Sequence, residues 1–107
     1  MSVDAEVHVL GSVLLDNDVL TVLAGSLQPK HFKLEANRTI YQSMQRLSGN
    51  GKPIDLVTLT EDLRQHDELE AVGNVPYLIG LMDIVPTAAY AERYAKTLLN
   101  GDSAVAS

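Results

Sequence analysis

The chain has 107 residues, a net charge of −6 and 46% hydrophobic residues. This length and composition suit one domain that builds its own hydrophobic core. Because the chain contains no cysteine, disulfides, Cys-ligated metal sites and thiol nucleophiles are excluded. The excess of acidic residues argues against a stand-alone nucleic-acid-binding protein, since such proteins gain affinity by neutralising phosphates with basic side chains.

The N-terminus does not read as a targeting signal. Asp4 and Glu6 precede its apolar run, whereas a signal peptide begins with basic residues. No segment approaches the ~20 apolar residues that a membrane-spanning helix needs. We therefore expect a cytoplasmic protein with no membrane contact.

Helical periodicity begins at the first residues. Apolar residues recur at helical spacing at Val7, Leu10 and Leu14, which predicts a helix over about 3–15. Ser2 is its expected N-cap, and the helix dipole favours the acidic residues of its first turn. A short second helix follows an Asp-Asn-Asp turn and is stopped by Gly25.

The middle of the chain predicts two longer helices. Phe32 is expected to fill the core just before a third helix over about 34–48, which the sequence Gly-Asn-Gly ends. Ile54 is a second expected core residue, in an extended link. A fourth helix over about 55–66 has two candidate N-caps, Asp55 and Thr58, and the sequence leaves the choice open.

The last third predicts two more helices and a tail. Pro76 suits the first turn of a fifth helix, whose expected core residues are Leu78, Leu81, Met82 and Val85. Thr87 is the expected cap of a sixth helix that carries a core stripe and ends at Asn100-Gly101. The residues of this stripe are Ala91, Tyr94, Ala95 and Leu98. Residues 101–107 are expected to form a flexible tail, which leaves 1–100 as the domain.

The pattern as a whole predicts the all-α class. No long alternating run indicates a strand, and the loops are short. Short loops favour antiparallel hairpins between consecutive helices. We therefore expect a compact bundle of about six short helices.

No catalytic constellation is visible in the sequence. The segment Gly49-Asn-Gly51-Lys52 resembles the end of a phosphate-binding loop, but Arg46 and Pro53 occupy positions where that loop needs Gly and Ser or Thr. A helix C-cap followed by a turn explains it better. Asp4 and His8 lie one helical turn apart, without further ligands at a recognisable spacing. We therefore expect no catalytic residue, cofactor or metal ion.

Tyrosines gather in the last third of the chain. Tyr90 and Tyr94 lie one turn apart on the sixth helix, and tyrosine is common at protein interfaces. Tyr94 belongs to the core stripe, whereas Tyr90 lies on its flank. We therefore predict that Tyr90 is exposed, that Tyr94 is partly buried, and that both contribute to partner binding.

Several segments, in order and in register over about residues 5–99, carry a family resemblance. They are Glu6–Asn17, Phe32 with Asn37–Leu47, Gly51–Leu59, the positions Leu69, Gly73, Tyr77-Leu78 and Leu81, then Val85–Ala89 and Tyr94-Ala95. Together they resemble the N-terminal domain of bacterial DnaB-type replicative DNA helicases, and Gly51-Lys-Pro-Ile-Asp-Leu-Val-Thr-Leu59 resembles that family's most specific signature. The chain departs from the family pattern at Asn37, Asn74 and Tyr90, which puts surface contacts in doubt.

The resemblance implies an assembly role in DNA replication. Family heads form a collar on a hexameric helicase ring, pair as a trimer of dimers and help to dock primase in the primosome. The ATPase domain, which uses ATP and Mg²⁺, is not in this sequence. The resemblance therefore implies a non-catalytic head that binds primase and other helicase subunits, and that by itself is a monomer or weak dimer.

Two alternatives stay open from the sequence. One is the helicase-binding domain of a primase, which resembles the helicase head in fold. The other is a collar module that binds single-stranded DNA, for which Lys30, Lys33 and Arg38 supply a loose basic cluster diluted by Glu35. The acidic composition leads us to expect weak or absent contact with DNA.

Overall fold

Helices make up most of the chain. The computed structural model describes residues 3–106, with side chains for residues 4–100. The elements are α1 (Val3–Leu15), α2 (Asp18–Leu23), the 3-10 turn η1 (Pro29–His31), α3 (Glu35–Gly49), α4 (Leu56–Gln65), α5 (Asn74–Ile84) and α6 (Ala91–Ala106). Since no strand occurs within that described range, the predicted all-α class is confirmed. Nor is any helix there long and apolar enough to cross a bilayer.

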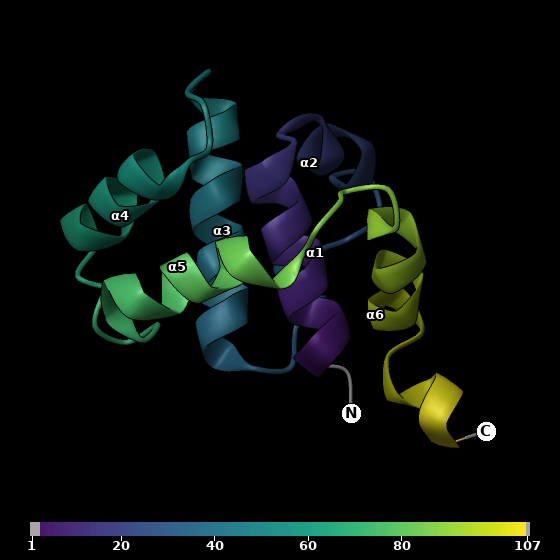
Figure 1. The fold of residues 1–107 in the computed structure, drawn as a ribbon. Coiled ribbons are helices and arrows are strands. Elements are labelled where there is room, and N and C mark those ends of the chain that lie inside the picture. The colour runs from purple at the N-terminus through teal and green to yellow at the C-terminus, as the bar shows by residue number, and fades with distance from the viewer. Residues whose placement is uncertain (1–2, 107) are drawn as a thin grey trace.

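The central element is α1, on which α2, α3, α5 and α6 all pack (Figure 1). In its middle turns Val9, Leu10 and Val13 are fully buried; Val9 and Val13 share one face, and Leu10 lies about 100° further round the helix from Val9. Both α5 and α6 pack on α1, with α6 running alongside it (Figure 1), and Tyr77 of α5 reaches Asn37 of α3 through a hydrogen bond. The prediction that consecutive helices pair as hairpins is therefore wrong for α5 and α6, since both pack chiefly on α1.

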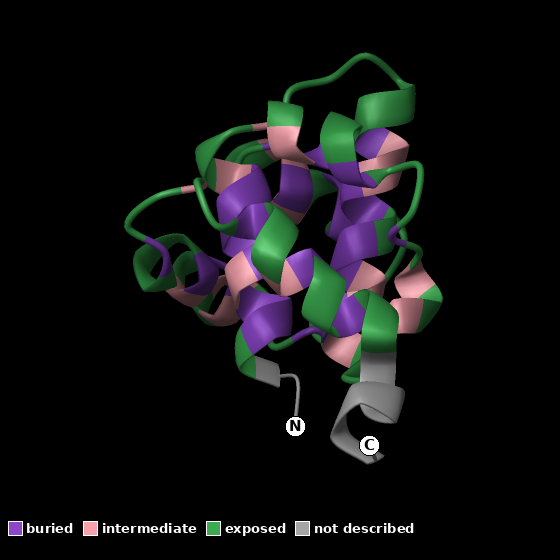
Figure 2. Ribbon diagram, turned by 90° about the vertical axis from the view of Figure 1, so that its right-hand side faces the viewer, coloured by how far each residue is buried: buried purple, intermediate pink, exposed green. Residues whose placement is uncertain are grey.

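Buried residues gather on the inward faces of the helices, and the connecting loops are largely exposed (Figure 2). Phe32 and Ile54 are buried, as predicted, and the Phe32 ring lies 4.8 Å from the Tyr41 ring. Met82 was predicted to face the core, but it is exposed. On α5, Leu78 and Leu81 occupy the buried face, and Met82 lies about 100° further round the helix from Leu81.

The cap of α4 is settled by reciprocal hydrogen bonds. The Asp55 carboxylate accepts from the Thr58 backbone N–H at 2.8 Å, and the Thr58 hydroxyl accepts from the Asp55 N–H at 2.9 Å. Asp55 is therefore the N-cap, and Thr58 is its partner in a capping box.

The ends of α6 differ from the prediction. The helix begins at Ala91, and the Thr87 hydroxyl accepts from the Ala89 N–H at 3.1 Å, within the connector that precedes the helix. The helix runs to Ala106, so Asn100-Gly101 does not end it, because a glycine weakens a helix without forbidding it. Whether residues 101–107 are flexible stays a prediction, and the cap at Ser2 lies outside the described residues.

A buried polar chain joins three helices. The Glu6 carboxylate of α1 is buried at the start of α3, where it accepts from the Lys33 N–H at 2.6 Å and from Asn37 Nδ2 at 2.8 Å. Asn37 Oδ1 in turn accepts from the Tyr77 hydroxyl of α5 at 2.6 Å. Asn37 was expected to affect surface contacts, but it is buried and ties α1 to α5.

Candidate protein-interaction surface

The two predicted tyrosines meet at a small cleft beside α1. Tyr90 is 56% exposed, and Tyr94 is half-buried with its ring stacked on His8 at a centroid distance of 4.5 Å. The predicted exposure of Tyr90 and partial burial of Tyr94 are therefore confirmed. The cleft has a volume of about 250 Å³ and is lined by His8, Ser12, Val85, Pro86, Thr87, Tyr90 and Tyr94.

The wall of this cleft on α1 is held by local hydrogen bonds. His8 Nδ1 lies 2.6 Å from the Asp4 carbonyl oxygen, and the Ser12 hydroxyl donates to the His8 carbonyl at 2.7 Å. The contact with the Asp4 carbonyl orients the imidazole ring, on which the Tyr94 ring stacks. The Asp4 carboxylate does not join His8 in a ligand set, and among the described residues no group of three or more potential ligands is placed to hold a metal ion.

A glycine allows the opposite wall to approach. A Cβ atom on Gly11 would lie 2.5 Å from the Leu81 carbonyl oxygen and 2.6 Å from Val85 Cγ2. Only a residue without a side chain lets α1 and the end of α5 come this close. The connector between α5 and α6 therefore starts directly against α1 and delivers Tyr90 to the rim of the cleft.

The segment that resembled a phosphate loop is a helix end. The Asn50, Gly51 and Lys52 N–H groups donate to carbonyl oxygens of the last turn of α3, with Lys52 N bonded to the Leu47 oxygen at 2.9 Å. A phosphate cradle would need such N–H groups to point at the ligand. Gly51 supplies the positive φ of 70° that the turn requires, as expected for a C-cap.

An ion-pair cluster links α3, α4 and the loop that follows α4. Arg46 Nη2 lies 2.6 Å from Asp62 Oδ2 and 2.9 Å from Glu68 Oε1, and the Ser43 hydroxyl donates to Asp62 at 2.6 Å. Desolvation by burial opposes the charge on Asp62, but hydrogen bonds from Arg46 and Ser43 and the positive charge of Arg46 lower the pKa of Asp62. The cluster is a structural clamp with every buried polar atom among the described side chains satisfied.

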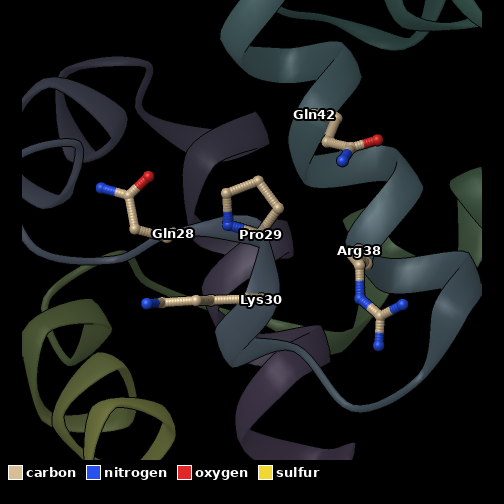
Figure 3. A pocket seen from close by; sticks show the side chains of 5 residues that line it. All are labelled: Gln28, Pro29, Lys30, Arg38 and Gln42. Atoms are coloured by element: carbon tan, nitrogen blue, oxygen red, sulfur yellow. The ribbon is translucent and has the colours of Figure 1, made fainter.

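Of the loose basic cluster noted in the sequence, the structure brings two members to one groove. Lys30 of η1 and Arg38 of α3 line it together with Gln28, Pro29 and Gln42 (Figure 3). Lys33 is exposed nearby but does not line it. Sequence reasoning could not have identified this groove, because it depends on how η1 docks against α3.

Comparison with known proteins places the chain in a family. Residues 1–100 match the family model described as DnaB-like helicase N terminal domain. The chain therefore belongs to the DnaB-like helicase N-terminal domain family, and this match favours the helicase head over the primase alternative.

Individual relatives agree. The chain is 43% identical over 95 residues to the replicative DNA helicase DnaB of Geobacillus stearothermophilus, a match that covers 89% of the chain and 21% of that protein. The replicative DNA helicase DnaC of Bacillus subtilis (strain 168) is 41% identical over 95 residues, with the same two coverages of 89% and 21%. The chain thus spans about a fifth of the length of these curated relatives.

A solved structure supports the fold in detail. The crystal structure of the N-terminal domain of DnaB helicase from Mycobacterium tuberculosis has a TM-score of 0.87 to this chain at 36% sequence identity. The match covers 91% of this chain and 67% of that one. The six-helix arrangement is therefore that of a helicase N-terminal domain.

Proposed function

We propose that this chain is a non-catalytic assembly domain of a replicative DNA helicase, which pairs with neighbouring subunits in a collar and helps to dock primase. The observation that carries the proposal is the exposed Tyr90 at the rim of an aromatic cleft, in a chain that belongs to the helicase head family. Catalysis, with ATP and Mg²⁺, falls in this proposal to the family's ATPase domain. The setting is a cytoplasmic primosome.

The cleft has the chemistry of a protein-binding site. A tyrosine at an interface offers a large rigid ring with few rotatable bonds and a hydroxyl that can bond to a partner. Tyr90 presents such a ring to solvent, and Tyr94 and His8 provide an apolar floor beside it. The surface thus combines an exposed anchor with a small pocket that a partner side chain can fill.

Truncation of each tyrosine separates binding from stability. Tyr90→Ala should change the free energy of unfolding by no more than about 0.5 kcal/mol, as is usual for exposed side chains. It should weaken self-association, measured by sedimentation, or binding to the cognate primase, measured by titration. Tyr94→Ala should lower the free energy of unfolding by about 1–2 kcal/mol, because it removes a stacked aromatic contact.

A matched control comes from α4. Val57 is 71% exposed and far in sequence from the cleft, so Val57→Ala should leave both stability and partner binding unchanged. If Tyr90→Ala lowers stability by several kcal/mol without a separate loss of binding, Tyr90 is a structural residue and the proposed surface is wrong.

A further inference from the structure

The groove between η1 and α3 is a second surface with a distinct chemistry. It has a volume of about 560 Å³, and its lining combines two cations and two carboxamides around one proline. Figure 3 shows Gln28 and Lys30 on one side of the Pro29 ring and Arg38 and Gln42 on the other. Polar groups therefore stand on both sides of a rigid apolar floor.

The groove is formed in advance of any ligand. The segment before η1 is fixed by the Tyr41 hydroxyl, which donates to the Leu27 carbonyl at 2.9 Å, and the segment after η1 is fixed by the buried ring of Phe32. Within the turn, the Gln28 N–H donates to His31 Nδ1 at 2.8 Å. A partner would therefore bind here without first ordering the backbone of the groove.

Arg38 is also held in place. Its Nε and Nη2 atoms donate to the Phe32 carbonyl oxygen at 3.3 and 3.2 Å, which fixes one edge of the guanidinium. Neither Arg38 nor Lys30 forms an ion pair with a carboxylate anywhere in the described part of the chain. In a chain with 14 acidic and 8 basic residues, a groove with two cations and no acid in its lining is a local exception to the overall charge.

The arrangement of these groups favours one class of ligand. Because the cations stand on opposite sides of Pro29, they suit carboxylates at two points along an extended segment better than one small oxyanion. The amides of Gln28 and Gln42 can bond to the polar main chain of such a segment. No aromatic side chain lines the groove for base stacking, which favours a protein segment over single-stranded nucleic acid.

We propose that this groove binds an extended acidic segment of a partner protein, with Lys30 and Arg38 each meeting a carboxylate. The groove is independent of the Tyr90 cleft, since the two share no lining residue. It therefore adds a second contact surface, for a partner of defined charge, to the proposed assembly function.

The test is a titration followed by NMR. The probe is a soluble synthetic peptide in which glutamate alternates with serine, and the control peptide has glutamine in place of glutamate. The glutamate peptide should shift the backbone amides of residues 28–42, and added salt should weaken the binding, because exposed charge pairs are screened. The double variant Lys30→Gln/Arg38→Gln neutralises both cations of the groove. It should bind the glutamate peptide about tenfold more weakly, because two exposed ion pairs are lost.

Matched variants separate the groove from net charge and from folding. Lys52→Gln/Lys96→Gln removes the same charge from two exposed lysines that line other hollows, and it should bind the peptide like the parent chain. Lys30→Gln alone leaves the Arg38 hydrogen bonds intact and should still weaken binding. Tyr90→Ala should not affect peptide binding, so this proposal and the proposed assembly surface fail separately.

Three outcomes would overturn the proposal. One is that the glutamate and glutamine peptides shift the amides equally or not at all. Another is that the control double variant loses as much affinity as the groove variant. The last is that an oligothymidylate binds the same amides more tightly than the peptide does, which would assign the groove to single-stranded nucleic acid.

Discussion

The buried chain from Glu6 through Asn37 to Tyr77 is open to a nearly isosteric test. Asn37→Asp keeps the acceptor for the Tyr77 hydroxyl but replaces Nδ2, which lies 2.8 Å from Glu6 Oε1, with an oxygen. Two carboxyl groups would then face each other in a fully buried site. Like charges at such a distance cannot both ionise without a large penalty, so one proton should be retained.

The size of the stability loss in Asn37→Asp can be bounded for two cases, with both carboxyls ionised or with one protonated. Loss of the hydrogen bond to a charged group costs about 1.5–3 kcal/mol, and repulsion adds to this if both carboxyls ionise. If the new carboxyl instead keeps its proton at pH 7, the cost is at most about 4 kcal/mol, from the ordinary aspartate pKa of about 3.9 and 1.36 kcal/mol per pH unit. We therefore expect Asn37→Asp to lower the free energy of unfolding by about 2–4 kcal/mol at neutral pH.

The stability lost in Asn37→Asp should depend on pH in a defined direction. The folded variant holds a proton that the unfolded chain releases above about pH 4, so its deficit relative to the parent chain should grow as the pH rises from there. Urea unfolding at about pH 4 and pH 7 measures this deficit. Tyr77→Phe is the control: it breaks the other end of the chain without adding a carboxyl, so it should cost about 1 kcal/mol at both pH values.

Tyr77 itself does not interfere with this comparison. Desolvation by burial raises the pKa of Tyr77 above its ordinary value of 10.0, so its hydroxyl stays protonated at both pH values. If Asn37→Asp is as stable as the parent chain at neutral pH, or if its deficit is the same at both pH values, the two carboxyls are not held together and the assigned chain of hydrogen bonds is wrong.

Two further stability predictions concern the α4 cap and Gly11. Asp55→Ala should remove the capping box of α4 and lower the free energy of unfolding by about 1 kcal/mol, or several degrees of Tm, without loss of partner binding. Thermal unfolding of Asp55→Ala, compared with Asp55→Asn, checks this. A loss of binding at unchanged stability would instead make Asp55 a functional residue. Gly11→Ala should cost about 1–3 kcal/mol, because its Cβ would lie 2.5 Å from the Leu81 carbonyl oxygen. Gly80→Ala in α5, where a Cβ would meet nothing within 4 Å, should instead leave the chain as stable or slightly more stable; equal effects of the two substitutions in urea unfolding would show that α1 and α5 are not packed this closely.

Some features followed from the sequence because their causes are local. Helices such as α3 and α4 were predictable within a residue or two, since their apolar spacing and end signals lie within the segment itself. Phe32 and Ile54 were recognisable as core residues for the same reason, as large apolar side chains in short connectors. The exposure of Tyr90 and the partial burial of Tyr94 also followed from their positions on one helical wheel.

Other features depend on partners that are distant in sequence. An acidic residue in the first turn of a helix is expected to face solvent and to interact with the helix dipole. Glu6 is buried instead, because its hydrogen bonds come from about thirty residues away, from Asn37 and from N–H groups before α3. Met82 was predicted to lie in the core but is exposed, because helical periodicity defines the faces of a helix and does not say which face packs against another element. The groove at Lys30 and Arg38 likewise exists only because Tyr41 and Phe32 fix η1 against α3. Local sequence signals thus sufficed for the helices and for the family, whereas the buried polar chain, the cleft beside α1 and the groove at η1 depend on packing, since side chains from separate elements make them.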